Sequence, residues 1–320
     1  MSEWKPLSEP GVAMRRAALI ERAREYFGDQ GVLAVDTPAL GRYAISDPNI
    51  DNLRVQTRPG KDSYLQTSPE IYMKRLLASG YPDIYSICRV FRDGESGPRH
   101  LPEFTMAEWY RIGFDLDAIV EDCVSFIAAC LGVDPAGDHV ERIEYRDAVR
   151  EYAGIDAIEA DTAALIEVAT DDPRLRGQLA NDRNAALDLI MSTVVAPLLP
   201  RDRLTVVQHY PADQAALARL CPADSRVADR FEIFSGELEL ANGYVELTDA
   251  SEQRQRIERD IALREQSGRS SLPTDESLIA ALEAGLPECA GVSVGIERLH
   301  MVLDQAEDIR DVINFATETA

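Results

Sequence analysis

Residues 239–247 read ELANGYVEL, a stretch that places two carboxylates and one amide in a segment whose composition is otherwise typical of a β-strand. Glu239 and Glu246 are an odd number of positions apart, so an unbroken strand would point their side chains to opposite faces. One bulged residue would return both to the same face, and Asn242-Gly243 is a turn or bulge signal. The stretch therefore predicts a bulge near Gly243 and an acidic face that a cation must compensate.

Two carboxylates and an amide on one face are also typical of a hard-cation site. A magnesium ion held by one or two carboxylates usually completes its coordination with substrate phosphate. This pattern predicts nucleotide chemistry, with Glu239 and Glu246 as the metal ligands. A hairpin with a solvated acidic face explains the same residues, and the segment alone does not separate the two interpretations.

Length and composition favour one large domain over residues 1–320, because 45% of the 320 residues are hydrophobic and no Pro/Gly/Ser-rich linker divides them. The N-terminal stretch MSEWKPLSEPG lacks the apolar run of a secretory signal. No run of about 18 apolar residues is present to span a bilayer. We therefore expect a cytoplasmic protein without membrane contact.

The charge balance bears on the partners. With 33 basic and 56 acidic residues, the formal charge is −23, which predicts repulsion of polyphosphate backbones and argues against nucleic acid as a partner. The five cysteines are an odd number and contain no CxxC pair. This argues against a disulfide framework and against a structural zinc site.

The order of the predicted elements favours an α+β fold with an antiparallel sheet, because strands and helices are grouped rather than strictly alternating. Strands are predicted at 31–38, 85–91, 104–111, 205–210, 231–234, 237–247 and 291–296. Helices are predicted at 12–28, at 67–77 with Ser68 as N-cap and Pro69 first in the helix, at 251–266 and after 296. Residues 114–204 read as a helical insertion.

No GxxxxGK[ST] and no GxGxxG pattern occurs, so a bound nucleotide would need another phosphate cradle. Arg92, in the long tip between the strands at 85–91 and 104–111, can bind phosphate oxygens through two parallel hydrogen bonds. Phe104 and Arg298 can sandwich an adenine ring between an aromatic face and a guanidinium plane. Each of the three alone is more often an ordinary surface or core residue.

Three blocks together resemble the class II aminoacyl-tRNA synthetases of the lysyl type. Arg92 with HLPEFTMAEWY (100–110) resembles motif 2, ELANGYVEL resembles the acidic strand, and GVSVGIERL (291–299) resembles motif 3. Helix 12–28 and the strand ending at Pro38 resemble motif 1, which forms a homodimer interface in that family. The resemblance implies an antiparallel sheet flanked by helices, ATP and Mg²⁺ as substrate and cofactor, and a homodimer.

Within that family the chain is most similar to stand-alone members that attach (R)-β-lysine to a lysine of elongation factor P instead of charging tRNA. Only about a dozen residues precede the motif 1 resemblance, so no anticodon-binding domain is expected, and the charge of −23 disfavours tRNA. Ser293 stands where the tRNA enzymes have glycine. A truncated lysyl-tRNA synthetase that charges tRNA or releases free adenylate, and a catalytically silent amino-acid-binding regulator, are the alternatives.

The resemblance also implies the residues of the site. Those for the amino acid, lysine or β-lysine, are Ser68, Pro69, Glu70, Glu108, Tyr110, Asn242, Glu246 and Ser293. Those for ATP are Arg92, Asp93, Gly94, Glu95, His100, Phe104, Glu239, Leu240, Gly295 and Arg298, with Arg92 and Arg298 as the catalytic cations.

The chain departs from the family pattern at three places. Motif 2 usually reads Arg, any residue, Glu, but here Glu95 is displaced by one position, so that either a turn at Gly94 restores it or Asp93 substitutes. Leu101 replaces an asparagine that often follows the motif 2 histidine. Ser293 differs from the alanine expected in the elongation factor P ligases, which leaves the choice between (R)-β-lysine and α-lysine open.

Overall fold

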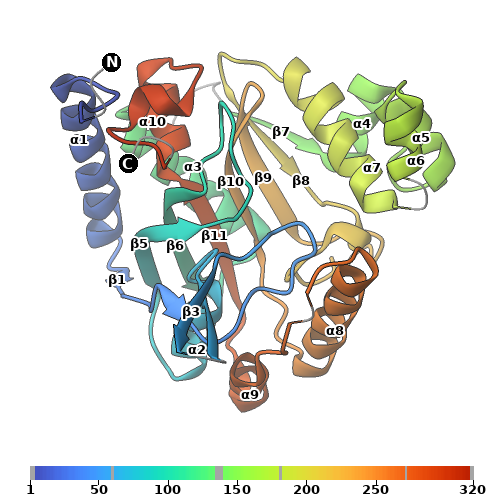
Figure 1. The fold of residues 1–320 in the computed structure, drawn as a ribbon, viewed down its shortest axis with the longest axis horizontal. Helices are drawn as coiled ribbons and strands as arrows, with labels where there is room; N and C mark the ends of the chain where they lie inside the picture. Colours follow the sequence, from blue (N-terminus) through green and yellow to red (C-terminus); the bar gives the residue numbers. More distant parts are fainter. Residues whose placement is uncertain (1–3, 59–60, 134–139, 180–181, 271, 318–320) are drawn as a thin grey trace.

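The computed structural model describes residues 4–58, 61–133, 140–179, 182–270 and 272–317. An eight-stranded sheet forms its centre (Figure 1). In spatial order its strands are β1 (Leu33–Ala34), β5 (Ile84–Phe91), β6 (Glu103–Ile112), β11 (Cys289–Gly295), β10 (Leu238–Val245), β9 (Arg230–Ser235), β8 (Leu204–Gln208) and β7 (Val140–Glu144). Neighbours are antiparallel except at the two edges, where β1 runs parallel to β5 and β7 runs parallel to β8. The predicted α+β class with an antiparallel sheet is confirmed.

One face of the sheet is covered by α1 (Pro10–Asp29), α3 (Leu116–Leu131) and α10 (Ile296–Asp304). In α1, Leu19, Ala23 and Phe27 are spaced by four, so they share one helix face, and all three are fully buried against the sheet. Helix α3 is delimited locally, because Asp115 accepts a hydrogen bond from the amide of Ala118 at its start. This face forms the main hydrophobic core.

The opposite face of the sheet carries α2 (Glu70–Ala78), α8 (Ala250–Gln266) and α9 (Glu276–Gly285), which share a smaller core with the ends of β5, β6 and β11. A separate sheet of three strands, in the order β2 (Leu40–Gly41), β4 (Lys61–Leu65) and β3 (Arg54–Arg58), lies beside them. The small sheet was not predicted. The cavity described below lies on this face.

The predicted insertion of residues 114–204 contributes to two different hydrophobic cores. Its residues 134–139 and 180–181 lie outside the described residues. Helix α3 belongs to the main core, whereas four short helices build a second core against β8 and the end of β9. They are α4 (Tyr145–Ala153), α5 (Thr162–Ala169), α6 (Pro173–Gln178) and α7 (Arg183–Ile190). Strand β7 was missed, because its apolar residues Val140 and Ile143 are three apart, a spacing that suits a helix better than a strand.

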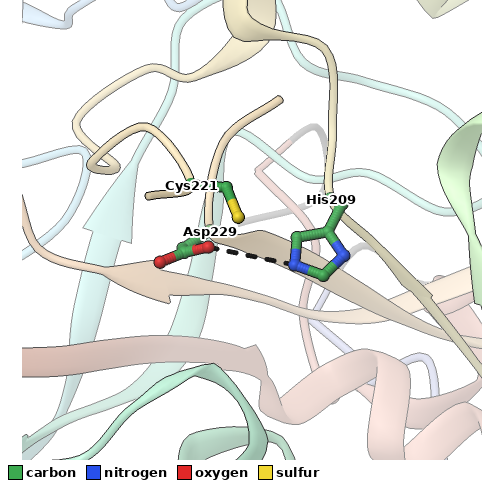
Figure 2. Close-up of side chains that lie close together, drawn as sticks. All are labelled: His209, Cys221 and Asp229. Carbon is green, nitrogen blue, oxygen red and sulfur yellow. Dashed lines mark ion pairs between the residues drawn. The ribbon is translucent and has the colours of Figure 1, made fainter. Parts of the chain in front are cut away.

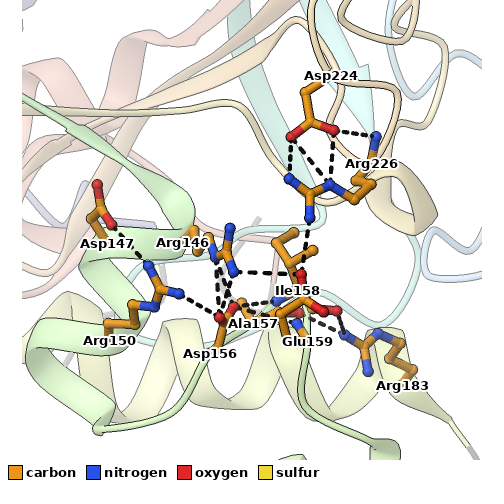
Figure 3. A network of polar contacts seen from close by, with 10 residues as sticks. All are labelled: Arg146, Asp147, Arg150, Asp156, Ala157, Ile158, Glu159, Arg183, Asp224 and Arg226. Carbon is orange, nitrogen blue, oxygen red and sulfur yellow. Dashed lines mark hydrogen bonds and ion pairs between the residues drawn. The ribbon is translucent and has the colours of Figure 1, made fainter.

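An ion-pair network joins these helices to the loop before β9 (Figure 3). Asp156 pairs with both Arg146 and Arg150, and Arg226 spans from Asp224 to Glu159. These groups are substantially exposed, so each pair adds little to stability by itself.

Two terminal predictions are refined. The predicted helix 12–28 is α1, but the strand ending at Pro38 is reduced to the two residues of β1. No helix within the described ranges combines the length and the apolar character needed to cross a membrane.

Candidate active site

A cavity of about 910 Å³ lies on the sheet face opposite the main core. Its floor is made by the central strands β6, β10 and β11, and its walls come from the start of α2, the loop 44–50, helix α8 and the loop 213–217. Among the predicted site residues, those that line it are Ser68, Glu70, Arg92, Glu108, Tyr110, Glu239, Asn242, Glu246 and Ser293.

The alternation of the strands separates the cavity from the core. On β6, Glu108 and Tyr110 line the cavity, whereas Ala107 and Trp109, which alternate with them, are fully buried in the main core. Strand β11 repeats this division, since Ser293 lines the cavity and its neighbours lie in the core. Polar side chains of these strands therefore face the cavity, and the apolar side chains that alternate with them face the main core.

The predicted bulge exists, but at a different residue. The register of β10 against β9 shifts between Glu239 and Ala241, so the extra residue is Leu240. Asn242 and Gly243 pair regularly with β9 and β11, and the Asn-Gly turn prediction is wrong at that position. The predicted effect of the bulge, which is to place both carboxylates on one face, is confirmed because Glu239, Asn242 and Glu246 all line the same cavity.

At one end of the cavity, a buried lysine compensates the carboxylates. The Nζ atom of Lys74 lies 2.7 Å from Oε1 of Glu70 and 2.5 Å from Oε2 of Glu246. Glu108 stands nearby and accepts hydrogen bonds from Ser68 at 2.7 Å and from Tyr110 at 2.8 Å. Three carboxylates thus share one ammonium group in a region from which water is largely excluded.

Burial makes this end of the cavity electrostatically incomplete. Desolvation raises the pKa of Glu246 well above its usual range, and it also raises the pKa of Glu108, where the charge of Glu70 adds to the effect. Oε1 of Glu246 is buried and has no hydrogen-bond donor among the described residues. An ammonium group entering the cavity would supply both the missing donor and the missing charge.

The start of α2 sets the position of Glu70. The helix begins at Glu70, one residue later than predicted, yet Ser68 still accepts a hydrogen bond from the Glu70 amide at 3.0 Å. The Tyr244 hydroxyl donates to Oε1 of Glu70 at 2.6 Å. Pro69 precedes the helix and does not line the cavity.

The floor beneath this pocket is built from small residues. A Cβ atom at Gly291 would lie 2.4 Å from Tyr110 and 2.6 Å from Oε1 of Glu246, so glycine leaves the space that these two side chains occupy. Ser293 sits opposite both Asn242 and Glu108 in the sheet. Its hydroxyl donates to the Asn242 carbonyl at 3.3 Å.

At the other end, Arg298 in the first turn of α10 binds Glu239 and contacts His100. Its Nη1 donates to the backbone carbonyl of Glu239 at 2.7 Å and to the Glu239 carboxylate at 3.2 Å. Its Nη2 lies 2.8 Å from Nε2 of His100, and burial together with the Arg298 charge lowers the pKa of His100. His100 therefore accepts this bond as the neutral imidazole.

Motif 2 residues form the second part of this end. The Arg92 guanidinium lies over the Phe104 ring, 5.1 Å from its centroid. The predicted placement of an adenine ring between Phe104 and Arg298 stays a prediction. Gly94 adopts φ +76°, and the turn brings Glu95 to 3.7 Å from Arg92. The geometry supports the interpretation in which Gly94 restores Glu95, while the Asp93 amide binds the backbone of Asp51.

Glu239 and Glu246 cannot share one metal ion, which corrects the predicted ligand pair. With the bulge discounted, six strand steps separate them, or about 20 Å along β10. The carboxylate near Glu239 is Glu232 of β9, whose pKa is raised by burial and next by the charge of Glu239. Both carboxylates line the cavity, and Glu232 is a site residue that was not predicted.

The remaining predicted residues lie outside the cavity lining. They are Pro69, Asp93, Gly94, Glu95, His100, Phe104, Leu240, Gly295 and Arg298. The side chain of Leu240 is buried in the main core, so only its backbone is available to a ligand. Leu101 is buried in the same core.

Lys74 and Tyr244 were missed as well. Lys74 follows Glu70 by four positions, a spacing that is usual for surface ion pairs on helices, so its type gave no sign of burial. Tyr244 lies two residues from both Asn242 and Glu246, and the period of the strand was a signal that identified its face.

Comparison with known proteins gives a consistent result. The tRNA synthetases class II (D, K and N) family matches residues 11–319. Proteins named elongation factor P–(R)-β-lysine ligase are similar over essentially the whole chain. The one from Erwinia tasmaniensis is 41% identical over 327 residues, which cover 99% of this chain and 98% of the relative. Those from Haemophilus ducreyi and Haemophilus influenzae are each 39% identical over 325 residues, with 97% and 99% of the relative covered.

Proposed function

The chain belongs to the class II tRNA synthetase family (D, K and N), whose members use ATP, and from that premise we propose that it is a ligase that joins (R)-β-lysine to a lysine of elongation factor P. The names of the relatives, which match over nearly their full length, support this choice of substrate and partner. A purely tRNA-charging role has no comparable support.

The observation that carries the proposal is the buried group of Glu70, Glu108 and Glu246 around Lys74. A diamino acid carries two ammonium groups, and each needs an anion when it leaves water. The unsatisfied Oε1 of Glu246 and the raised pKa of Glu108 indicate a site with carboxylate to spare. Such a pocket selects a cationic amino acid and rejects neutral ones.

The first step joins the amino acid to AMP. The substrate carboxylate attacks the α-phosphorus of ATP, and the bond to the pyrophosphate oxygen breaks. The enzyme needs no nucleophile of its own for this step, because holding the two reactants in contact and neutralising the phosphate charge supply the rate enhancement. Arg92 and Arg298 at the nucleotide end are the cations for that role, as the family resemblance implies.

The second step transfers the aminoacyl group to the partner protein. The ε-amine of the elongation factor P lysine attacks the activated carbonyl, AMP leaves, and an amide bond forms. The amine attacks in its unprotonated form, and the proton that it loses when the amide forms passes to the departing AMP or to solvent. The cavity of about 910 Å³ must admit the lysine side chain from outside while the adenylate is held.

The donor set near Arg298 fits a magnesium ion. Glu239 is partly exposed and lines the cavity, and Glu232, which is paired with Arg230, has a pKa raised by burial and next by the charge of Glu239. We assign Glu232 and Glu239 as the magnesium ligands in place of Glu239 and Glu246. When bound, the ion would neutralise phosphate charge.

We also propose a homodimer through α1 and the edge strand β1. Met14 on α1 is 71% exposed and Leu33 on β1 is 45% exposed, and both are large apolar side chains. β1 is an edge strand with a free backbone side. Sedimentation of the purified protein tests the dimer directly.

The test of the function uses the purified protein with ATP, labelled pyrophosphate and either (R)-β-lysine or α-lysine. We expect amino-acid-dependent exchange that is stronger with (R)-β-lysine, followed by transfer to elongation factor P and not to tRNA. The acceptor variant of elongation factor P that lacks the modified lysine is the matched control. Exchange with neither amino acid would overturn the proposal, and transfer to tRNA would assign the chain to the charging enzymes.

A further inference from the structure

Away from the active-site floor, three side chains of different chemistry converge. His209 follows β8, Cys221 lies in the loop beyond it, and Asp229 directly precedes β9 (Figure 2). One nitrogen, one sulfur and one oxygen of these residues lie within 4.8 Å of one another. The Nε2 atom of His209 is 3.9 Å from Oδ1 of Asp229, too long for a hydrogen bond.

The groups around these three residues leave one atom of each pointing inward. Nδ1 of His209 lies 2.7 Å from a carboxylate oxygen of Glu144, which fixes the ring and leaves Nε2 to face the cluster. Oδ2 of Asp229 accepts from Nε of Arg219 at 2.7 Å, which leaves Oδ1. A histidine whose second nitrogen is held by a carboxylate is the usual arrangement around a metal-bound imidazole.

We propose that His209, Cys221 and Asp229 bind one zinc ion. The ligand set of imidazole, thiolate and carboxylate suits zinc better than magnesium or calcium, which prefer oxygen alone. Zinc bonds of about 2.0–2.3 Å in a tetrahedron separate neighbouring ligand atoms by about 3.4 Å. The observed separations, 3.9 Å between Nε2 and Oδ1 and within 4.8 Å for all three atoms, require the ligands to close by up to about 1.4 Å on binding, and a water completes the coordination.

The absence of CxxC spacing and the odd number of cysteines predict no structural zinc site. The three ligands of this cluster are distant in sequence and meet only in the folded chain, so the spacing rule does not detect them. Cys221 lies within the loop that joins His209 to Asp229, far from both in sequence, and a backbone hydrogen bond from the Cys221 amide to the Val227 carbonyl folds that loop back onto itself. A single cysteine with a histidine and an aspartate leaves no local sequence pattern.

A metal here would fasten one wall of the active-site cavity. The loop between His209 and Asp229 contributes Gln214, Ala216 and Leu217 to the cavity lining. His209 and Ala216 both adopt positive φ, +56° and +48°, which is uncommon for residues other than glycine and needs support from the surroundings. Zinc at the two ends of the loop would supply part of that support, and so would influence the pocket without touching the substrates.

Without metal, the same residues form an ion-pair group, in which the hydrogen bond to Glu144 raises the pKa of His209. The two arrangements differ in what they bind. The full chain, purified under reducing conditions and treated with chelator, is titrated with Co²⁺ and then with Zn²⁺. We expect a thiolate-to-cobalt charge-transfer band, its loss on adding one equivalent of Zn²⁺, and a melting temperature raised by several degrees with zinc.

Matched variants assign the signal to this cluster. Cys221→Ser should abolish the charge-transfer band, and Cys88→Ser, at another half-buried cysteine, should retain it. Glu144→Gln keeps all three ligands but loosens His209, and it should weaken zinc binding about 10–100-fold. The Glu144 variant keeps the test valid if Cys221→Ser fails to fold.

Two results would overturn the proposal. One is the absence of a charge-transfer band in the wild-type chain together with a melting temperature that zinc does not change. The other is a band that survives Cys221→Ser or disappears in Cys88→Ser, which would mean an adventitious metal only. Neither result bears on pyrophosphate exchange, so this test and that of the proposed function fail independently.

Discussion

The charged side chains at the two ends of the candidate active-site cavity differ in exposure and in how they are paired. At the amino-acid end, Glu246 is 1% exposed and Lys74 is 2% exposed, and the carboxylates outnumber the cation. At the nucleotide end, Arg298 and Glu239 keep 20% and 38% of their side chains exposed and bind each other. Buried charge is weakly screened, whereas rim charge is shared with water, so changes at the first end should have the larger effects.

The largest effect is expected from Glu246→Gln. The variant removes the anion that faces both Lys74 and the incoming ammonium group, at an expected cost of about 3 kcal/mol, or more than about 100-fold in amino-acid-dependent pyrophosphate exchange. The fold should persist, because Lys74 keeps its contact with Glu70. Exchange assays with circular dichroism check this, and a folded variant within tenfold of wild type would contradict the role assigned to Glu246.

Gly291→Ala tests the same end by volume instead of charge. The added Cβ would lie 2.4 Å from the buried Tyr110 and 2.6 Å from Glu246, so both must move, at about 2 kcal/mol or roughly 30-fold in the amino-acid KM. Gly177→Ala on the exposed side of α6, where a Cβ meets no atom within 4 Å, is the control. An unchanged KM in the Gly291 variant would show that the floor is more pliable than its contacts suggest.

Glu239→Gln is the matching change at the rim, and the expected loss is smaller, about tenfold. If Glu239 is a magnesium ligand as proposed, the variant weakens it without burying a new unpaired charge, and raised Mg²⁺ should restore much of the exchange rate. Titration of activity against Mg²⁺ measures this. If Glu239→Gln proved as damaging as Glu246→Gln and magnesium failed to rescue it, the contrast between the two ends would not hold.

The pH dependence of stability should also come from the buried end. The folded pKa of Glu108 is raised, so between its unfolded pKa near 4.5 and its folded pKa of about 7 the folded protein binds more protons than the unfolded one. The free energy of unfolding therefore falls as pH rises through that window. Glu108→Gln should flatten the fall by about 1 kcal/mol, measured by denaturant unfolding at pH 5 and pH 8 without ligand. Parallel curves for the two proteins would argue against a raised pKa at Glu108.

The smallest effect is expected from Ser293→Gly. Ser293 lines the cavity, but its hydroxyl is bonded to the carbonyl of Asn242 and not to the carboxylate cluster. Removing the side chain should shift the preference toward α-lysine about threefold, or less than 1 kcal/mol. The ratio of kcat/KM values for the two amino acids measures the shift, and an unchanged ratio would remove Ser293 from specificity.

Residues whose position follows from the period of a strand were predictable from the sequence. The acidic face of β10 and the hairpin of β5 and β6 required only alternation and turn chemistry. The position of the bulge was not predictable, because Asn-Gly is the stronger local signal, yet Gly243 is needed where a Cβ would meet Phe231 and Val292 at 2.7 Å. Close packing and not a turn explains that glycine.

Contacts made by tertiary docking were beyond reach. Lys74 becomes buried only when α2 packs against the sheet and brings Glu70 to Glu246, two residues far apart in the chain. Glu232 pairs with Asn242 across the β9–β10 hairpin, and the extra residue Leu240 shifts Glu239 along the strand, so no fixed spacing relates Glu232 to Glu239. The acidic strand predicts a compensating cation, but only the packing of α2 identifies that cation as Lys74.

The bulge at Leu240 has a consequence for how related chains are found. Seven positions separate Glu239 from Glu246, and the bulge makes them behave as six, the even number that a straight strand requires. A chain with one residue fewer between the two carboxylates would present the same face to its cavity without any bulge. A search pattern that fixes the spacing at seven positions would discard such a chain. A pattern that accepts seven positions with a bulge or six positions without one would retain it.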